Sequence, residues 1–280
     1  MSVSPAALPA YSVLLPLAPW ESPPVLREAL ASLVAQGLPP AQVVVSCDGP
    51  PPEALALELE RAELPMDLVL GPGGEGLGPV LARGLLACRE ELVLRFDADD
   101  LCLHDRALWQ VQAMVRRPEL AALSAPLAEF QVDPQQASGC RTVPRGAHRL
   151  RRFSRWRNPL NHPAVILRRS RVLAAGNYRA RPGFEDYDLW LRLLRRGDSL
   201  DNLAEPVVLA RVGPAHLGRR QGWGYARREV AFLWACGREG LLPWAQVVLL
   251  LVLRPPLRML PAAGLGWLMA ALLRRSASRS

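Results

Sequence analysis

An acidic run, Arg95-Phe96-Asp97-Ala98-Asp99-Asp100, is the pattern in this 280-residue chain that most strongly indicates chemistry. Its three carboxylates fall within four residues after an apolar segment, and such crowding is costly unless a positive group lies among them. Mg²⁺ and Mn²⁺ prefer oxygen ligands and commonly bridge carboxylates to substrate phosphates. In an extended segment, Asp97 and Asp99 project to the same side. The run therefore predicts a metal–diphosphate site, with a solvated acidic turn that caps the next helix as the alternative.

A second acidic group lies in residues 184–190, with the sequence FEDYDLW. Acidic residues at the start of a helix are favoured by the helix dipole, so capping alone can explain them. Three acids are more than one cap needs, however, and the aromatic residues around them can raise the pKa of a carboxyl group toward general-base use. From these residues alone, both interpretations stay open.

A glycine-rich run, Gly71-Pro72-Gly73-Gly74-Glu75-Gly76, imitates the glycine pattern of dinucleotide-binding proteins. It differs because it follows the third expected strand, because Pro72 stiffens the turn, and because a cluster replaces the single acid expected about 20 residues later. A flexible loop over a phosphate or a sugar is the better interpretation. A nicotinamide site is the alternative.

Charge is divided unevenly along the chain, and all 34 basic residues are arginines. Residues 1–140 hold 8 Arg and 18 Asp+Glu, a net charge of −10, whereas residues 141–280 hold 26 Arg and 8 Asp+Glu, a net charge of +18. The asymmetry predicts a metal or sugar site in the first half and an anionic partner for the second. The basic belt from Arg141 to Arg181 has few aromatics and no nucleic-acid recognition motif, so we expect it to contact lipid head groups or a diphosphate and not nucleic acid.

Composition and periodicity indicate the elements that position these residues. A hydrophobic fraction of 50% excludes a disordered chain, and five scattered cysteines exclude a disulfide scaffold. The N-terminal residues lack the features of a secretory signal. Four buried strands alternating with three helices predict a parallel sheet whose ligands bind beyond the carboxyl ends of the strands. The expected strands are 11–15, 43–46, 67–70 and 92–96, and the helices between them are 24–35, 53–63 and 80–90.

The pattern loosens after a helix expected at residues 106–116. Residues 131–160 are polar, rich in arginine and poorly periodic, and are expected to form a long functional loop. A further strand and two helices follow, at 164–167, 171–175 and 185–196.

Two apolar runs, Leu241–Leu253 and Met259–Leu273, mark the C-terminal end of the sequence. Each is shorter than the ~20 residues that span a bilayer. Their flanking arginines, with Trp244 and Trp267, favour an interfacial or re-entrant membrane segment. A hydrophobic subdomain packed on the core is the alternative.

The motifs SVLLP, SCDGP, GLGPVLARGL, LRFDADDLCLHDRALWQ, NHPAVILRRS and FEDYDLWLRLLRRG together resemble the bacterial family-2 glycosyltransferases with the GT-A fold. The resemblance is to the branch that builds exopolysaccharide and lipopolysaccharide repeat units. It implies an α/β domain over residues 1–235, with a Rossmann-like, mostly parallel sheet flanked by helices. Residues 236–280 would form an apolar, membrane-associating segment.

The resemblance also implies how the donor is bound. Asp48 lies where the family holds the nucleotide base, and Asp97 and Asp99 match the D-x-D that binds the ribose–diphosphate through Mn²⁺ or Mg²⁺, with Asp99 as the main metal ligand. Further donor contacts are expected from Arg83, Arg106, Arg219 and Arg220. The chain departs from the family at Cys47, where an aspartate is frequent, and at Arg83, where an asparagine is common.

On the acceptor side, Asp186 matches the catalytic base, and Glu185 is expected to help bind the acceptor. His162 and Trp190 are further candidates for acceptor contacts, although an isolated histidine such as His162 is more typical of a core or a loop.

The implied reaction is an inverting transfer of a sugar from a nucleoside-diphosphate donor to a lipid-linked or growing saccharide, in cell-surface polysaccharide synthesis at the cytoplasmic side of the inner membrane. One base must deprotonate the acceptor hydroxyl, and a metal neutralises the charge that develops on the leaving diphosphate. The two acidic groups supply both requirements. The alternatives are a nicotinamide-dependent oxidoreductase built on Gly71–Gly76 and a non-catalytic scaffold that binds sugar nucleotides or membranes.

Overall fold

The computed structural model describes residues 8–103, 105–136, 139–212 and 221–259. The chain divides into two compact units, Met1–Val212 and Gly213–Ser280. The boundary expected at residue 235 falls instead inside a helix of the second unit, α9 (Trp223–Arg238).

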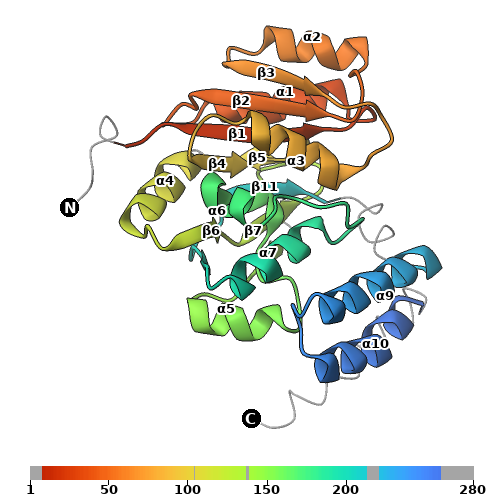
Figure 1. Cartoon of the computed structure of the whole chain (residues 1–280). Helices are drawn as coiled ribbons and strands as arrows, with labels where there is room; N and C mark the ends of the chain where they lie inside the picture. The colour runs from red at the N-terminus through yellow and green to blue at the C-terminus, as the bar shows by residue number, and fades with distance from the viewer. Residues whose placement is uncertain (1–7, 104, 137–138, 213–220, 260–280) are drawn as a thin grey trace. The chain divides into compact units, whose positions relative to one another are not determined.

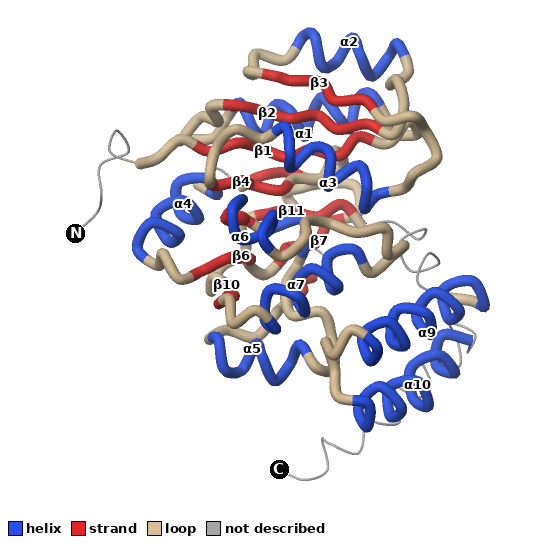
Figure 2. The backbone as a smooth tube through the Cα atoms, in the orientation of Figure 1, coloured by secondary structure: helices blue, strands red, loops and turns tan. Residues whose placement is uncertain are grey.

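A seven-stranded sheet forms the centre of the first unit (Figures 1 and 2). The strands lie in the order β10 (Ser199–Asn202), β6 (Leu120–Ser124), β9 (Ile166–Arg168), β4 (Leu92–Arg95), β1 (Tyr11–Leu17), β2 (Gln42–Cys47) and β3 (Met66–Leu70). Strand β9 runs antiparallel to β4 and β6, whereas the other pairs are parallel. The parallel arrangement expected for the first four strands is therefore confirmed.

Helices cover both faces of this sheet, as the alternating sequence pattern predicts. Helices α1 (Pro23–Val34), α2 (Glu53–Arg61), α3 (Leu77–Ala87) and α4 (Arg106–Arg116) agree with the expected ones to within a few residues. Along β1, Val13 and Leu15 pack in a core shared with α1 and α4, whereas Leu14 packs in a second core shared with α3. This alternation of side chains between two buried faces explains why the first strands read as nearly continuous apolar runs.

A second, four-stranded sheet lies beside the first and was not predicted. Its order is β5 (Leu101–Cys102), β11 (Val208–Arg211), β7 (Leu127–Phe130) and β8 (Gly139–Arg141). Strand β5 starts directly after Asp100 and pairs with β11, so this sheet fixes the position of the acidic run. Within the region expected to be one long loop, the structure forms β8 and helix α5 (Ala147–Ser154).

The remaining elements of the first unit are the 3₁₀ turn η2 (His162–Ala164) and helices α6 (Arg169–Ala174) and α7 (Glu185–Arg195). The helices confirm those expected at 171–175 and 185–196. Helix α7 is buried over most of its length, and its first residues follow a turn at Gly183.

The second unit contains α9 and α10 (Trp244–Met259), which pack on each other. The buried Glu229 of α9 pairs with Arg254 at 2.6 Å and with Arg258 at 3.1 Å on α10. The first apolar run lies largely in α10, and nearly all of the second lies outside the described residues. No helix in the described part of the chain is both long and apolar enough to cross a membrane.

Candidate active site

Three carboxylates lie together where β4 ends. Oxygen atoms of Asp97, Asp99 and Asp100 all lie within 4.8 Å of one another. The amide of Phe96 still bonds to the carbonyl of Leu14 in β1 at 3.0 Å, and the chain then turns so that Asp100 N–H donates to the Asp97 carbonyl at 3.4 Å. The structure thus brings Asp97 and Asp99 together as expected, at the carboxyl edge of the parallel strands, and adds Asp100 to the group.

The three carboxylates give this cluster a negative electrostatic potential. Burial raises the pKa of Asp100 well above its usual range, and the charges of Asp97 and Asp99 raise it further. Two groups oppose this rise in part. One is the positive charge of Arg95, whose guanidinium donates to Asp97 Oδ2 at 2.5 Å, and the other is the backbone N–H of Arg211, which donates to Asp100 Oδ1 at 3.0 Å. Three carboxylates with adjacent oxygens form a ligand set that suits Mg²⁺ or Mn²⁺, and such a cation would relieve their repulsion.

The carboxyl end of β2 carries the residues expected at the nucleotide. Asp48 accepts hydrogen bonds from the backbone N–H groups of Glu75, at 3.2 Å, and Gly76, at 3.0 Å. Arg83 of α3 forms an ion pair with Glu75 and reaches the Cys47 carbonyl at 3.5 Å. Because two amides of the glycine-rich loop already bind Asp48, they are not presented to a dinucleotide phosphate as the nicotinamide hypothesis requires.

Arg106 occupies a different place from the one expected. Its side chain is fully buried, and its guanidinium donates to the carbonyls of Arg95, at 2.6 Å, and Pro163, at 2.9 Å. It also donates to the side chains of Gln110 in α4 and Cys102 in β5. The expected direct contact with the donor is therefore wrong for this geometry. Arg106 instead links the end of β4 to the turn before β9, and so stabilises the backbone that precedes the acidic cluster.

The start of α7 separates the roles of its acidic residues. Asp186 is half-buried; it accepts from Asn158 Nδ2 at 2.5 Å through one oxygen and from its neighbour's backbone N–H at 2.7 Å through the other. Asp188 is buried and pairs with Arg192 at 2.7 Å. No side-chain cap is formed at the N-cap residue, Phe184, although Asp186 does accept an N–H of the first turn, so these acids also suit the start of the helix. Asp186 is the carboxylate that combines partial exposure with a fixed orientation, and Glu185 beside it is buried.

His162 and Trp190 lie behind this site in the core. Trp190 is 0% exposed, so the expected direct contact with an acceptor is wrong. Its ring packs edge-on against His162 at 6.0 Å between centroids, and His162 Nε2 lies 2.9 Å from the hydroxyl of Tyr178. Burial lowers the pKa of His162 well below its usual range, and the positive charge of Arg95 lowers it further. His162 is therefore a neutral, hydrogen-bonded core histidine, as an isolated histidine more often is.

Three residues of the site, Asn158, Arg95 and Arg211, were not predicted from the sequence. Asn158 contacts Asp186 across 28 positions of the chain, and no local pattern indicates that contact. Arg95 directly precedes the acidic run, and its charge was the available signal. Arg211 comes from the unpredicted second sheet. The expected diphosphate contacts Arg219 and Arg220 lie outside the described residues.

An α/β sheet that carries an acidic cluster beyond a parallel strand, with a further carboxylate held separately at the start of α7, defines a GT-A-like class of fold and site. Residues 19–174 match the family model described as glycosyl transferase family 2. The chain therefore belongs to glycosyl transferase family 2.

Relatives and solved structures agree with this assignment. The chain is 34% identical to the amylovoran biosynthesis glycosyltransferase AmsE of Erwinia amylovora over 222 residues, which cover 79% of this chain and 83% of that protein. It is 28% identical to the UDP-Gal:alpha-D-GlcNAc-diphosphoundecaprenol beta-1,3-galactosyltransferase of Escherichia coli over 269 residues, or 95% and 98% of the two chains. The mannosyltransferase PcManGT of Pyrobaculum calidifontis, solved with GDP-Man and Mn²⁺, superposes with a TM-score of 0.65 at 20% identity, over 99% of this chain and 77% of that one. At that identity, the likeness is one of fold.

Proposed function

We propose that the chain is an inverting glycosyltransferase that moves a sugar from a nucleoside-diphosphate donor to a lipid-linked or growing saccharide in cell-surface polysaccharide synthesis. The observation that carries the proposal is the group formed by Asp97, Asp99 and Asp100 at the end of a parallel strand in a family-2 chain. The relatives support it, since one takes part in amylovoran biosynthesis and another acts on a diphosphoundecaprenol-linked sugar.

On the donor side, Asp99 and Asp97 would hold Mn²⁺ or Mg²⁺. A cation there supplies neutralisation of the charge that develops on the leaving diphosphate. Asp48 and Arg83 would bind the nucleoside end, because they flank the same edge of the sheet at the end of β2. Arg219 and Arg220 are proposed to contact the diphosphate.

On the acceptor side, Asp186 would accept the proton of the attacking hydroxyl, and Glu185 would help position the acceptor. Inversion requires that the hydroxyl approach the anomeric carbon from the face opposite the leaving group, so the base and the diphosphate site must be separate. The carboxylates that follow β4 and those at the start of α7 would meet this requirement. The hydrogen bonds from Asn158 and from the backbone N–H of residue 187 fix the orientation of the Asp186 carboxylate.

The proposal is tested by release of nucleoside diphosphate from a panel of UDP- and GDP-sugars in the presence of Mn²⁺. The wild type is expected to turn over one donor in a metal-dependent way, and Asp99→Asn to lose that turnover while keeping its circular dichroism spectrum. If no donor in the panel gave metal-dependent release, the non-catalytic scaffold would be the better account.

We also propose that the second unit holds the enzyme at the cytoplasmic side of the inner membrane. Apolar side chains on α10 are exposed, including Val248 at 56% and Val252 at 66%, which lie on one face of the helix. Helices that lie on membranes bury such a face among the lipids. The variant Val248→Arg/Val252→Arg is expected to shift the protein from the membrane fraction to the soluble fraction. An unchanged distribution would favour a hydrophobic subdomain packed within the protein.

A further inference from the structure

A hollow on the surface of the first unit collects positive and aromatic side chains. Its volume is about 530 Å³, and its lining consists of Pro144, Arg149, Arg152, Phe153, Arg155 and Trp156, on and around α5. It belongs to a segment, residues 134–184, that contains 12 arginines and no aspartate or glutamate. The hollow is therefore placed in the most positive stretch of the chain, and the proposed transfer reaction leaves it without a role.

The side chains of the hollow suit a ligand with a phosphate head and an apolar tail. Arg149 and Arg152 are exposed, and within the part of the chain that the structure describes neither side chain has a hydrogen-bond or ion-pair partner. Guanidinium groups in this state bind phosphate oxygens through paired N–H donors. Beside them, Phe153 is half-buried and Trp156 is 48% exposed, so apolar surface adjoins the charges.

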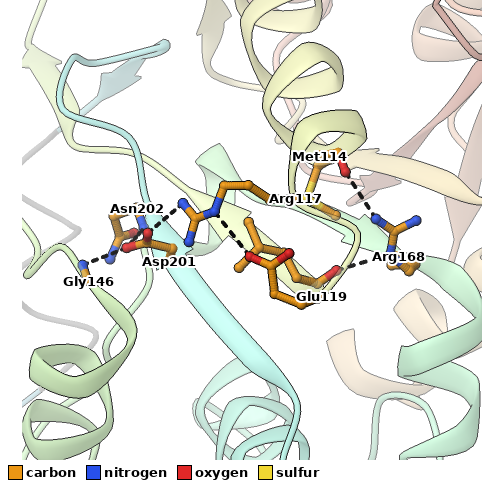
Figure 3. Close-up of polar contacts among 8 residues, drawn as sticks. Met114, Arg117, Glu119, Gly146, Arg168, Asp201 and Asn202 are labelled. Carbon is orange, nitrogen blue, oxygen red and sulfur yellow. Dashed lines mark hydrogen bonds and ion pairs between the residues drawn. The ribbon is translucent and has the colours of Figure 1, made fainter.

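A polar network holds the N-terminal side of the hollow in place (Figure 3). The carboxylate of Asp201 accepts from Gly146 N–H at 2.7 Å, immediately before α5, and from Arg117 Nη1 at 2.6 Å at the end of α4. Asn202, next along β10, donates to the carbonyl of Pro144 at 2.7 Å. The turn that leads into α5 is thus fixed to the main sheet and is not a loose surface loop.

The other end of the hollow is joined to the proposed catalytic base. The hydroxyl of Tyr187 donates to the Ser154 carbonyl at 2.6 Å, which holds the end of α5 against α7. Two residues beyond Trp156, Asn158 donates to Asp186 at 2.5 Å. Two residues of chain span at most about 7 Å, so the Cα atom of Trp156 in the hollow lies within that distance of the Cα atom of the residue that orients the base.

We propose that this hollow binds the diphosphate of a lipid-linked acceptor, an inference that rests on the proposed transferase function. Arg149 and Arg152 donate to the phosphate oxygens, and the first units of the lipid chain pack on Phe153 and Trp156. The sugar on the far side of the diphosphate then extends toward Asp186. Bulk membrane lipid fits less well, because a flat array of charges would serve a membrane surface, whereas here the cations surround a concavity next to the base.

The binding test uses farnesyl diphosphate as a soluble lipid diphosphate, titrated calorimetrically into the full-length protein in EDTA, which removes divalent cations and so prevents metal-dependent diphosphate binding at the acidic cluster. The double variant Arg149→Gln/Arg152→Gln is expected to weaken binding by roughly tenfold or more, since each charge-assisted hydrogen bond is worth about a factor of ten. Arg61→Gln is the matched control, because Arg61 is an exposed arginine on α2, at the opposite end of the unit (Figure 1), and it should bind as the wild type does. Farnesol, which lacks the phosphates, should bind at least ten times more weakly than farnesyl diphosphate.

Two results would overturn the inference. One is equal binding of farnesyl diphosphate by the double variant and the wild type. The other is a double variant that binds phosphatidylglycerol vesicles more weakly than the wild type does but still binds farnesyl diphosphate normally, which would assign the arginines to the membrane surface. This test can fail or succeed independently of the proposed function. If the protein bound farnesyl diphosphate through these arginines but released no nucleoside diphosphate from any sugar donor, the diphosphate site would be supported and the transferase function contradicted. If the protein were an active transferase but the double variant bound farnesyl diphosphate normally, only the proposed diphosphate site would be contradicted.

Discussion

The donor side and the acceptor side of the proposed site are built in opposite ways. The metal-binding part of the donor side consists of Asp97, Asp99 and Asp100, neighbours in sequence that a single strand end places together. The acceptor side depends on contacts between distant parts of the chain, such as Asn158 with Asp186 and Arg117 with Asp201. A strand end in a parallel sheet places adjacent residues by backbone geometry alone, whereas a surface assembled from loops and short helices needs specific polar contacts. We therefore expect substitutions on the donor side to affect chemistry without affecting the fold, and those on the acceptor side to affect both.

The largest effect is expected for Asp99→Asn. Loss of a charged ligand should remove most of the metal's stabilisation of the leaving diphosphate, which is worth several kcal/mol, or a loss of about 10³-fold in turnover. The measurement is nucleoside diphosphate release with Mn²⁺. Glu60→Gln, which neutralises an exposed acid on α2, is the control for charge and should be fully active. Equal activity of the two variants would remove Asp99 from the metal site.

Asp186→Asn should come next, with a loss of roughly 10²–10⁴-fold, the usual contribution of a general base. Its KM for the donor and its dependence on Mn²⁺ should stay as in the wild type, because the proposed role of Asp186 is proton transfer and not donor or metal binding. The comparison with Asp188→Asn sharpens the assignment: Asp188 is buried in an ion pair with Arg192, so its loss should lower the melting temperature. A variant Asp186→Asn that lost donor binding would place the base elsewhere.

A smaller effect, about tenfold in kcat, is expected for Asn158→Ala. The hydrogen bond from Asn158 fixes one oxygen of the candidate base, and bonds to charged groups contribute about 1.5–3 kcal/mol. Because Asn158 positions Asp186 and does not bind the donor, the donor KM should not change, and Asn158→Gln should recover part of kcat. A rise in the donor KM with kcat unaltered would contradict this role.

The smallest effect on activity is expected for Asp201→Asn, which should instead lower the stability of the fold. Burial favours a raised pKa for Asp201, but the N–H groups of Gly146 and Asn202 and the Arg117 guanidinium outweigh it and hold the pKa below its usual range. Folding thus favours the ionised form of Asp201. Its contribution to the free energy of unfolding, about 2 kcal/mol, is present above pH ~4 and is lost as the pH falls through the folded-state pKa.

Urea unfolding of the wild type and of Asp201→Asn at pH 7 and at pH 3 tests this expectation. The two proteins should differ at pH 7, and the difference should become smaller at pH 3. A difference that stayed constant with pH would mean that packing, and not the charge of Asp201, holds the turn before α5.

The same contrast explains what could be predicted from the sequence. The strands β1–β4 and the helices between them follow from local alternation of apolar runs and amphipathic segments, and the acidic cluster follows from its position after such a run. Helix α5 was missed because only Leu150 and Ser154 of its eight residues are buried, which leaves almost no apolar period. The second sheet was missed because its strands, two to four residues long, give no periodic signal.

Two buried side chains, Arg106 and Trp190, show why a residue's role was predicted wrongly from the sequence. Arginine is seldom fully buried unless it is paired, so an arginine near an acidic motif is naturally assigned to the ligand. Arg106 is buried because carbonyl groups of two separate segments, at Arg95 and Pro163, accept its N–H groups, and those acceptors are brought together only by the fold. Trp190 was assigned to the acceptor for its aromatic ring, but in a helix that is buried on most sides that ring fills the core.

The central claim is that metal–donor binding and proton transfer belong to separate carboxylates, and calorimetric binding of UDP and GDP with Mn²⁺ tests it most directly. For the nucleotide that the wild type binds, Asp186→Asn should show the same affinity, and Asp99→Asn should show no gain in affinity when Mn²⁺ is added. Equal Mn²⁺-dependent binding by wild type and Asp99→Asn, or its loss in Asp186→Asn, would contradict the account.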